Sequence, residues 1–531
     1  MSAFSPSAIL PRAIPDEVRS HGREVAAGHV GKLAGVLLPS FGSAIFVIVL
    51  MNVLFLSAGT RMLFRDGDTG WHVRTGEAII AQRAVPTTDT FSLIHAGRGW
   101  FAWEWLAEVL LGGAHLLAGP AGVALLAALV IALTGWGAWR LALSLGGNLF
   151  LALAMLLPLL GASTIHWLAR PHIFSWLLAL AFMTIAERYR RGLPVFGSKR
   201  SLLLLPLLSC LWANVHGSFL LGTALLLIYA VGAWLQGRER ATAGRHFALA
   251  GLATLLASFI NPYGWHVHQH IFAYLRNTYL MDHISEFRSF SFHGPGAIYV
   301  EMFLLLAAAG TFLLFRQKAY GPALLSLALM HMSLYSARHL PTYAILMSPI
   351  FVAAISAEWS PLPRLQSAVR YSARLLAMDR RVLGVVPSVL GLLLVVIALR
   401  AESRADRVGF DSRKFPVAAA SFLTAGPAGE NIADRRVFAR DYWGGYLIYR
   451  FAGELKVFVD GRSDFYREDW LETYAQINEV KPGWDRLLDG FQINTVLIPP
   501  AHPLAGALRL HTDWRLAYAD GVAAVFERKA L

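Results

Sequence analysis

The sequence predicts an α-helical membrane protein of about thirteen spans with a small α/β domain at its C-terminal end. Three observations lead to this fold class. Of the 531 residues, 56% are hydrophobic and only 15% are charged, whereas soluble domains carry about 25% charged residues. The apolar residues form long runs, for example at 34–56, 303–315 and 382–399. After residue 400 the charges increase and the apolar runs become shorter.

The long apolar runs indicate membrane-spanning helices. A helix needs roughly 20 apolar residues to cross the hydrocarbon core, where only helices and closed barrels satisfy their backbone groups. Barrel strands alternate between apolar and polar residues, which these runs do not. After residue 200 the sequence predicts seven spans, at 201–215, 217–236, 246–261, 297–316, 321–336, 340–358 and 382–400.

The basic residues set the expected orientation. They cluster in short loops, which are cytoplasmic in most membrane proteins. This pattern explains the net charge of +13 without a nucleic-acid partner. The N-terminus is then cytoplasmic, and the loops 58–103 and 261–296 and the domain 401–531 are extracytoplasmic. The clusters are Arg12, Arg19, Arg23 and Lys32; Arg188, Arg190, Arg191, Lys199 and Arg200; Arg238, Arg240 and Arg245; Arg316 and Lys318; and Arg364, Arg370, Arg374, Arg380 and Arg381.

The number of spans follows from this orientation. A cytoplasmic N-terminus and an extracytoplasmic C-terminus require an odd number. Residues 104–187 must also contain an odd number, yet they hold four apolar stretches, at 104–118, 120–139, 148–166 and 171–187. We therefore expect thirteen spans, with eleven as the alternative.

The chain is predicted to consist of a cytoplasmic segment 1–33, a transmembrane domain 34–400 and a domain 401–531. In the last, strands are expected at 436–439, 457–459 and 495–498, helices at 416–423, 470–477 and 484–491, and a hairpin formed by 514–518 and 523–527. Because Cys210 is the single cysteine, no disulfide within the chain can stabilise this domain, which must hold together by packing.

The loop 58–103 is the richest in chemically useful residues. Asp66 and Asp68 follow the first span directly, and His72 and Arg74 lie four and six residues after Asp68. Carboxylates near an anionic lipid surface are repelled by it, so they need a cation, a donor or an acceptor group beside them. The alternative is an ordinary cap, in which Asp68 or Thr69 begins the next helix. Both interpretations stay open at this point.

Other polar groups point to the same side of the membrane. Trp100, Trp103 and Trp105 are typical of an interfacial aromatic belt, with sugar stacking as the alternative. The loop 261–296 contributes Asp282 and Glu286, and its carboxylates could complete a metal or acid–base site with the first loop. The polar residues at the same ends of the spans indicate a partly cationic cavity suited to an anionic lipid phosphate: His166, Arg170, His172, Asn214, His216, Asn261, His266, His268, His270, Arg338 and His339.

These motifs together resemble a known family. Asp68, His72 and Arg74 resemble the first-loop motif of oligosaccharyltransferase catalytic subunits, especially the archaeal form, and Ile284-Ser285-Glu286 resembles the end of their fifth outer loop. Asp441-Tyr442-Trp443-Gly444-Gly445-Tyr446 is faintly similar to their acceptor motif but lacks the double tryptophan. The wider group is the C-type fold of glycosyltransferases (GT-C), which includes protein mannosyltransferases, the lipid A aminoarabinose transferase and uncharacterised bacterial members.

The resemblance implies an enzyme of the bacterial inner membrane that transfers a sugar from a polyprenyl-phosphate donor to an unknown glycan, lipid or protein acceptor. It implies Asp68, with Asp66 as substitute, as the base, and Glu286 as a group that positions the acceptor or binds Mg²⁺ or Mn²⁺ together with Asp68. The implied donor-phosphate residues are Arg338, His339, Arg170 and His172. The implied acceptor residues are Glu286, His72, Arg74, Tyr442 and Trp443.

Three other functions remain open on the sequence alone. A lipid-linked glycan polymerase or ligase would typically lack the carboxylate-rich first loop and the C-terminal domain. A non-catalytic assembly or sensor protein would use the outer domain to bind a partner. A transporter would place its polar residues near the middle of the membrane, whereas here they gather at one side.

Overall fold

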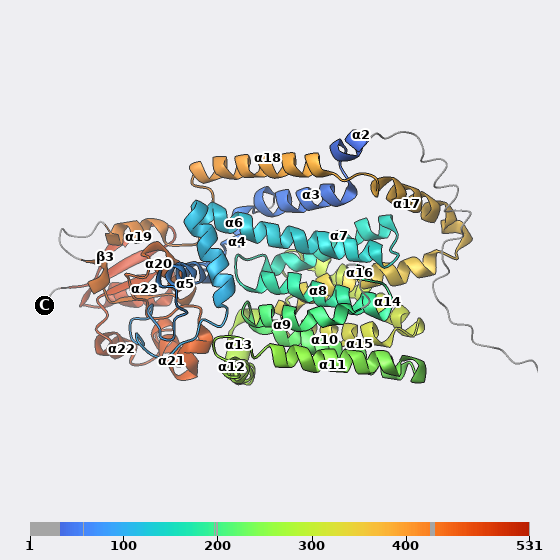
Figure 1. Cartoon of the computed structure of the whole chain (residues 1–531). Coiled ribbons are helices and arrows are strands. Elements are labelled where there is room, and N and C mark those ends of the chain that lie inside the picture. Colours follow the sequence, from blue (N-terminus) through green and yellow to red (C-terminus); the bar gives the residue numbers. More distant parts are fainter. Residues whose placement is uncertain (1–31, 57, 196, 198–199, 425–430, 530–531) are drawn as a thin grey trace, which may run out of the picture.

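A computed structural model describes residues 32–529 apart from 57, 196, 198–199 and 425–430. Nearly all of the expected cytoplasmic segment 1–33, and Lys199 of the second basic cluster, therefore lie outside the described residues. Figure 1 shows a bundle of roughly parallel helices with a separate mixed domain at one end. The C-terminal part of the chain forms this domain, and helix α5 (Asp68–Gln82) of the N-terminal part lies against it.

The bundle has the composition of a membrane domain. In the described part of the chain, seven helical segments are long and apolar enough to cross a membrane by length and composition. This confirms the predicted fold class of a polytopic helical membrane protein with a small C-terminal α/β part. The seven segments are Gly35–Phe55, Trp105–Ser144, Leu149–His166, Gly217–Leu235, Ala297–Arg316, Ala337–Trp359 and Val385–Arg404.

All four apolar stretches expected in residues 104–187 are helical. They form α6 (Trp105–Ser144), α7 (Leu149–Ser163) and α8 (His172–Arg190). The stretches 104–118 and 120–139 are the two parts of α6, which is broken between them where Ala118 and Gly119 leave helical backbone angles ahead of Pro120. The segment before this break packs against α5. Because this segment lies against α5, three helical segments remain as spans; this is an odd number, as the loop charges require, and corresponds to the alternative of eleven spans instead of thirteen.

All seven spans expected after residue 200 are helical. They are α9 (Leu205–Ala213), α10 (Leu220–Leu235), α11 (Ala241–Ala257), α14 (Ala297–Arg316), α15 (Tyr320–Tyr335), α16 (Leu340–Trp359) and α18 (Val385–Arg404). α16 is almost wholly buried in the centre of the bundle. α18 lies at its edge beside α3 (Phe41–Phe55), with most of its side chains exposed.

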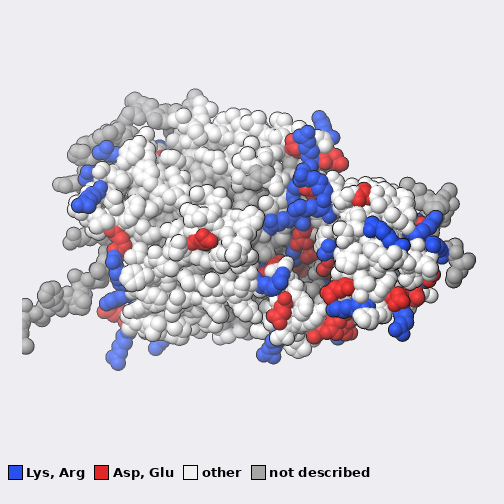
Figure 2. Space-filling view, turned by 180° about the vertical axis from the view of Figure 1, so that it is seen from behind, with Lys and Arg blue, Asp and Glu red and all other residues white. Residues whose placement is uncertain are grey.

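The surface of the bundle is that of a protein surrounded by lipid. Figure 2 shows few charged side chains over its middle, whereas charges gather at both ends and on the C-terminal domain. Leu305, Phe312 and Leu394 are examples of large apolar side chains that are more than half exposed. Such exposure would be costly in water and is favourable against lipid tails.

Two long loops lie at the end of the bundle that faces the C-terminal domain. Residues 58–103, the first long loop, contain α4 (Thr60–Leu63) and α5. Residues 261–296, the second long loop, contain α12 (His266–Leu275), α13 (Thr278–His283) and the 3₁₀ turn η5 (Ser285–Phe287). The remaining short elements are α2 (Lys32–Leu37), α17 (Gln366–Asp379), η1 (Thr164–His166), η2 (Ser201–Leu204), η3 (Gly217–Phe219), η4 (Arg238–Arg240), η6 (Ala337–His339), η7 (Pro363–Leu365) and η8 (Ile432–Asp434).

The C-terminal domain is a four-stranded sheet with helices around it. Its strand order is β1-β2-β4-β3, in which β1 and β2 are parallel and the other two pairs are antiparallel. The strands are β1 (Val437–Ala439), β2 (Thr495–Ile498), β3 (Trp514–Ala519) and β4 (Ala524–Arg528). The helices are α19 (Val417–Thr424), α20 (Asp441–Arg450), α21 (Ser463–Asn478), α22 (Trp484–Gly490) and α23 (Pro503–Leu510).

One predicted strand of this domain is wrong. Residues 457–459 form single bridges from Val457 to Ser92 and to Val437 instead of a strand. Val457 exchanges hydrogen bonds with the first long loop, accepting from Leu93 at 2.8 Å and donating to Phe91 at 3.0 Å. The segment is apolar because it lies between that loop and the sheet. The other strands, the hairpin and the three expected helices are present, while α20 and α23 were not predicted.

A buried ionic group fastens the first long loop to the C-terminal domain. The Arg462 guanidinium donates to Asp460 at 2.7 and 2.8 Å and to Asp89 of the loop at 2.7 Å. Its carbon Cζ lies 4.8 Å from the centre of the Trp100 ring. Trp100 is therefore part of the domain's core, and the expected aromatic belt does not include it.

Arg462→Ala should strongly destabilise the protein, because it leaves Asp460 and Asp89 buried without their counter-ion. Breaking such a buried pair costs about 3–5 kcal/mol. The measurement is the free energy or midpoint of thermal unfolding in detergent. Arg515→Ala is the control, since Arg515 is 63% exposed and pairs with Glu527, an interaction worth at most about 1 kcal/mol. Equal effects of the two substitutions would contradict this account.

Candidate functional site

The two carboxylates of the first long loop lie at the start of α5. The residue preceding this helix is Gly67, and the structure gives it no side-chain capping bond within the described residues. Asp66 Oδ1 instead accepts a hydrogen bond from the Asp68 backbone N–H at 3.0 Å. Asp68 is the first residue of the helix, so its carboxylate is free for other partners. The capping interpretation of Asp68 therefore does not hold.

Arg170 brings these two carboxylates together. It lies in the turn before α8, and its Nη1 is 2.5 Å from Asp66 Oδ2 while its Nη2 is 3.1 Å from Asp68 Oδ2. A guanidinium presents a planar set of donors that matches carboxylate oxygens. Arg170, expected at a lipid phosphate, thus forms ion pairs with both candidate base residues.

Glu286 approaches the same guanidinium from the second long loop. Its Oε2 is 3.9 Å from Arg170 Nη1 and 3.0 Å from His166 Nε2, and its Oε1 is 3.8 Å from Arg338 Nη1. Arg338 also lies over the Phe287 ring, 4.5 Å from its centre. Asp66, Asp68, Glu286, Arg170 and Arg338 form one group of charges, which we call the carboxylate cluster.

The C-terminal domain covers the cluster through close backbone contacts. Gly70 of α5 packs against Gly445 of α20, so a side chain at either position would collide with the other helix. A side chain at Gly461 would collide with the Asp68 carboxylate. The domain therefore lies directly on Asp68, and the glycines allow this approach.

The environment moves the pKa values of the two principal carboxylates in opposite directions. Burial raises the pKa of Asp68 to about 8, the charge of Asp66 adds to the rise, and Arg170 opposes it. Burial also raises the pKa of Glu286, but the charges of Arg338 and Arg170 outweigh this and bring it down to about 2. Near neutral pH, Glu286 is thus ionised, whereas Asp68 carries an exchangeable proton.

A second buried polar group, which the sequence did not predict, lies between α5 and the start of α6. His72 Nδ1 is 3.1 Å from Glu108 Oε1, and Glu104 lies between His72 and His216, with oxygens 3.8 and 3.3 Å from their Nε2 atoms. Burial raises the pKa of Glu104 to about 8. Glu104 and Glu108 lie in an otherwise apolar, tryptophan-rich stretch. Two carboxylates in such a stretch were the sequence signal that could have predicted a buried polar group. His72 therefore contacts buried glutamates, and a role toward an acceptor stays a prediction.

Two other expected site residues, Arg74 and Trp443, make contacts that stabilise the fold. Arg74 pairs with Glu77 at 2.5 Å and donates to the Tyr449 carbonyl at 2.6 and 3.0 Å. Trp443 is fully buried, and its Nε1 donates to the Lys414 carbonyl at 3.0 Å. These contacts hold α5 and α20 in place.

The remaining expected residues lie around the cluster. His172 Nε2 donates to the His166 carbonyl at 2.8 Å and so closes the turn that carries Arg170. Tyr442 is 39% exposed, and its backbone lies against Gly67. His339 follows Arg338 in η6 and is partly exposed. Of the expected phosphate residues, Arg170 and Arg338 thus enter the cluster directly.

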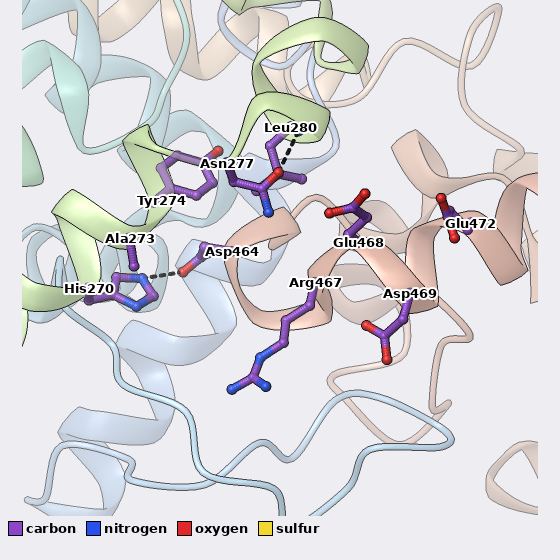
Figure 3. Close-up of a pocket in the computed structure, with 10 residues that line it drawn as sticks. All are labelled: His270, Ala273, Tyr274, Asn277, Leu280, Asp464, Arg467, Glu468, Asp469 and Glu472. Carbon is purple, nitrogen blue, oxygen red and sulfur yellow. Dashed lines mark hydrogen bonds and ion pairs between the residues drawn. The ribbon is translucent and has the colours of Figure 1, made fainter.

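A cleft of about 630 Å³ separates the second long loop from α21. Figure 3 shows Tyr274 and Asn277 of the loop facing Arg467, Glu468 and Glu472 of the domain, with His270 hydrogen-bonded to Asp464. The Tyr274 ring lies 5.7 Å from Phe287, which follows Glu286. Tyr274, which lines the cleft, therefore contacts the neighbour of Glu286. The wall formed by α21 carries four carboxylates beside Arg467, namely Asp464, Glu468, Asp469 and Glu472.

The cluster does not have the arrangement of a metal site. Within the described residues, no group of three or more His, Cys, Asp or Glu side chains is placed to hold a metal ion. A hard cation such as Mg²⁺ must contact its carboxylate ligands directly, whereas here the Arg170 guanidinium lies between Asp68 and Glu286. The expected shared ion at Asp68 and Glu286 does not fit this arrangement.

Comparison with solved structures identifies the fold. The oligosaccharyltransferase of Archaeoglobus fulgidus in its apo form matches with a TM-score of 0.56 and 11% identity, over 86% of this chain and 69% of that one. The oligosaccharyltransferase AglB of the same organism, in complex with an inhibitory peptide and a dolichol-phosphate, matches with a TM-score of 0.55 and 11% identity, over 92% and 74% of the two chains.

A bacterial structure matches over nearly its full length. ArnT from Cupriavidus metallidurans bound to undecaprenyl phosphate has a TM-score of 0.52 and 15% identity, over 91% of this chain and 97% of that one. No protein-family model and no curated protein matches the sequence. The chain therefore has the fold of the C-type membrane glycosyltransferases, as its motifs predicted, and the likeness lies in the fold.

The raised pKa of Asp68 predicts a pH dependence of stability. The unfolded carboxyl loses its proton near pH 3.8, whereas the folded one keeps it to about pH 8. Between these values the folded state binds more protons, so the contribution of Asp68 to the free energy of unfolding decreases as the pH rises. Asp68→Asn should flatten the decline, measured as thermal midpoints across a pH series. Asp282→Asn on exposed α13 is the control, and an unchanged slope in Asp68→Asn would contradict the prediction.

Proposed function

We propose that the protein is a membrane glycosyltransferase that moves a sugar from a polyprenyl-phosphate-linked donor to an extracytoplasmic acceptor. The observation that carries this proposal is the carboxylate cluster, in which Asp68, Glu286 and Arg338 converge from separate loops beneath the C-terminal domain of a C-type fold. The related structures support it, since AglB was solved with a dolichol-phosphate and ArnT with undecaprenyl phosphate.

The proposed reaction is a single displacement at the anomeric carbon. An acceptor hydroxyl or amide attacks this carbon while its bond to the phosphate oxygen breaks, and the lipid phosphate leaves with the electron pair. The ionised Asp68 takes the acceptor's proton. Since its pKa is raised to about 8, Asp68 is a stronger base than an ordinary aspartate. Asp66 contacts Nη1 of Arg170, whereas Asp68 contacts Nη2, so Asp66 helps to hold the guanidinium in place.

The charges around Glu286 suit the departing phosphate. The Arg338 guanidinium is 3.8 Å from Glu286, which is longer than a hydrogen bond, and it is 26% exposed. It can therefore turn toward a phosphate without first breaking a short contact. Positive charge placed where negative charge develops is among the strongest sources of enzyme catalysis.

The acidic cleft supplies a route for the acceptor. It runs between the second long loop and α21, and Tyr274 connects it to Phe287 beside the cluster. In the A. fulgidus enzyme, an acceptor peptide has been tethered in a solved structure. For this chain, the acidic walls of Asp464, Glu468 and Glu472 favour an acceptor that is cationic or rich in hydroxyl groups.

Membrane orientation follows the same proposal. With the basic loops in the cytoplasm, as the positive-inside rule favours, the proposed arrangement has a cytoplasmic N-terminus, and the carboxylate cluster and the C-terminal domain face the periplasm of a bacterial inner membrane. A donor lipid enters from the outer leaflet at the level of Arg338.

Arg338→Ala should weaken binding of undecaprenyl phosphate by about ten- to hundredfold, since hydrogen bonds to charged groups contribute about 1.5–3 kcal/mol. Binding is measured with the purified chain in lipid nanodiscs, and Arg338→Lys should recover part of it. The control is Arg316→Ala, at the C-terminal end of α14, which removes an exposed guanidinium paired with Glu358. If Arg338→Ala binds the lipid as the wild type does, the proposed phosphate site is wrong.

Asp68→Asn should reduce transfer from a polyprenyl-phosphate sugar by about 10²–10⁴-fold, the usual contribution of a general base. Wild-type transfer should increase with pH until about pH 8, where Asp68 becomes ionised. Both are measured as release of free lipid phosphate. Asp282→Asn serves as the matched carboxylate control, and full activity in both Asp68→Asn and Asp66→Asn would exclude the proposed base.

A further inference from the structure

We propose that Arg170 takes the place of a divalent cation in the carboxylate cluster, so that the site is charge-balanced by the protein and excludes a metal ion. Three carboxylates from the two long loops surround its guanidinium. Nη1 of Arg170 lies 2.5 Å from Asp66 Oδ2 and 3.9 Å from Glu286 Oε2, and Nη2 lies 3.1 Å from Asp68 Oδ2. Carboxylates that converge from different loops are the usual ligands of hard cations, and here a side chain lies at their centre.

The backbone around Arg170 holds the guanidinium there. The neighbouring Ala169 N–H donates to the Leu63 carbonyl at 3.0 Å, which ties the turn to α4. Pro171 follows directly, with a φ of −52°, and α8 begins at His172. The His172 ring closes the turn by donating to the His166 carbonyl at 2.8 Å. These contacts fix the turn from which the Arg170 side chain extends to the carboxylates.

The chemistry of the guanidinium explains why a cation cannot enter. Arginine stays protonated at all physiological pH values and offers a fixed fork of donors. Its nitrogens already lie against the oxygens of Asp66 and Asp68 that a metal would need. Glu286 is also engaged, because His166 contacts one oxygen at 3.0 Å and Arg338 approaches the other at 3.8 Å.

One structural neighbour of this chain has been solved with a metal ion. The A. fulgidus oligosaccharyltransferase has been solved in complex with Zn and sulfate. A single delocalised charge at the centre of the cluster holds the carboxylates less tightly than a divalent ion would, which suits a base that must exchange its proton. The consequence for transfer rests on the proposed function, whereas the consequence for metal binding does not.

The test is Mn²⁺ binding to the purified full-length chain, followed by electron paramagnetic resonance. The wild type should bind no stoichiometric Mn²⁺ at the cluster. Arg170→Ala removes the internal cation and should bind one Mn²⁺ at least about tenfold more tightly than the wild type, a change typical for a group that controls a metal site. Adding Asp68→Asn to Arg170→Ala should abolish the gain. Arg316→Ala is the control, since it removes an exposed guanidinium that pairs with Glu358 at the C-terminal end of α14, outside the cluster.

Each outcome decides the question. If Arg170→Ala does not fold, Arg170→Gln removes the charge with a side chain that still forms hydrogen bonds and gives the same readout. Stoichiometric Mn²⁺ binding by the wild type, or no gain in the folded variant, would overturn the inference. Transfer by the wild type should persist in EDTA, and its loss would also overturn it. Failure to bind undecaprenyl phosphate would overturn the proposed function and leave the Mn²⁺ result standing.

Discussion

Compensation of negative charge at the end of the helix bundle is the constraint on which the rest of this structure depends. Asp66, Asp68 and Glu286 come from two loops, and their ionised forms repel one another in a buried setting, where unpaired charges are strongly disfavoured. Arg170 lies between them and Arg338 faces Glu286 from η6. The two long loops, the turn before α8 and the start of α16 are therefore held in one arrangement by these two side chains.

The C-terminal domain is placed by a different kind of contact. Gly70 and Gly445 let two helix backbones meet, and Arg462 links the domain to Asp89 of the first long loop inside the protein. Together they seat Gly461 against Asp68. The domain and the loop therefore form one body, and the burial that raises the pKa of Asp68 depends on both. This is why a stability variant such as Arg462→Ala is expected to disturb the site as well.

The sequence predicted the fold class and most of the cluster but not its internal pairing. Long apolar runs identify helices because lipid imposes their length, and Asp68, Glu286 and Arg338 were found because ionisable residues at the ends of spans are unusual. Arg170 was assigned to a lipid phosphate, since nothing in a linear sequence shows that two loops converge on it. Glu104 and Glu108 were missed because their partners, His72 and His216, are distant in the chain. The boundary between the predicted stretches 104–118 and 120–139 coincides with the break at Ala118 and Gly119, but the sequence does not show that the first stretch lies against α5.

The two principal carboxylates are suited to different roles because their environments differ. Glu286 faces Arg338 and Arg170, which lower its pKa to about 2 and keep it ionised. Asp68 lies beneath the C-terminal domain, where burial and the charge of Asp66 raise its pKa to about 8. Where two carboxylates have pKa values moved apart in this way, the one with the raised value is the group that exchanges a proton during a reaction, and the other supplies a constant charge. Glu286 thus orients the arginines, and Asp68 is the residue whose proton can move. A divalent ion between them would lower both pKa values and remove this difference, whereas the single charge of Arg170 preserves it.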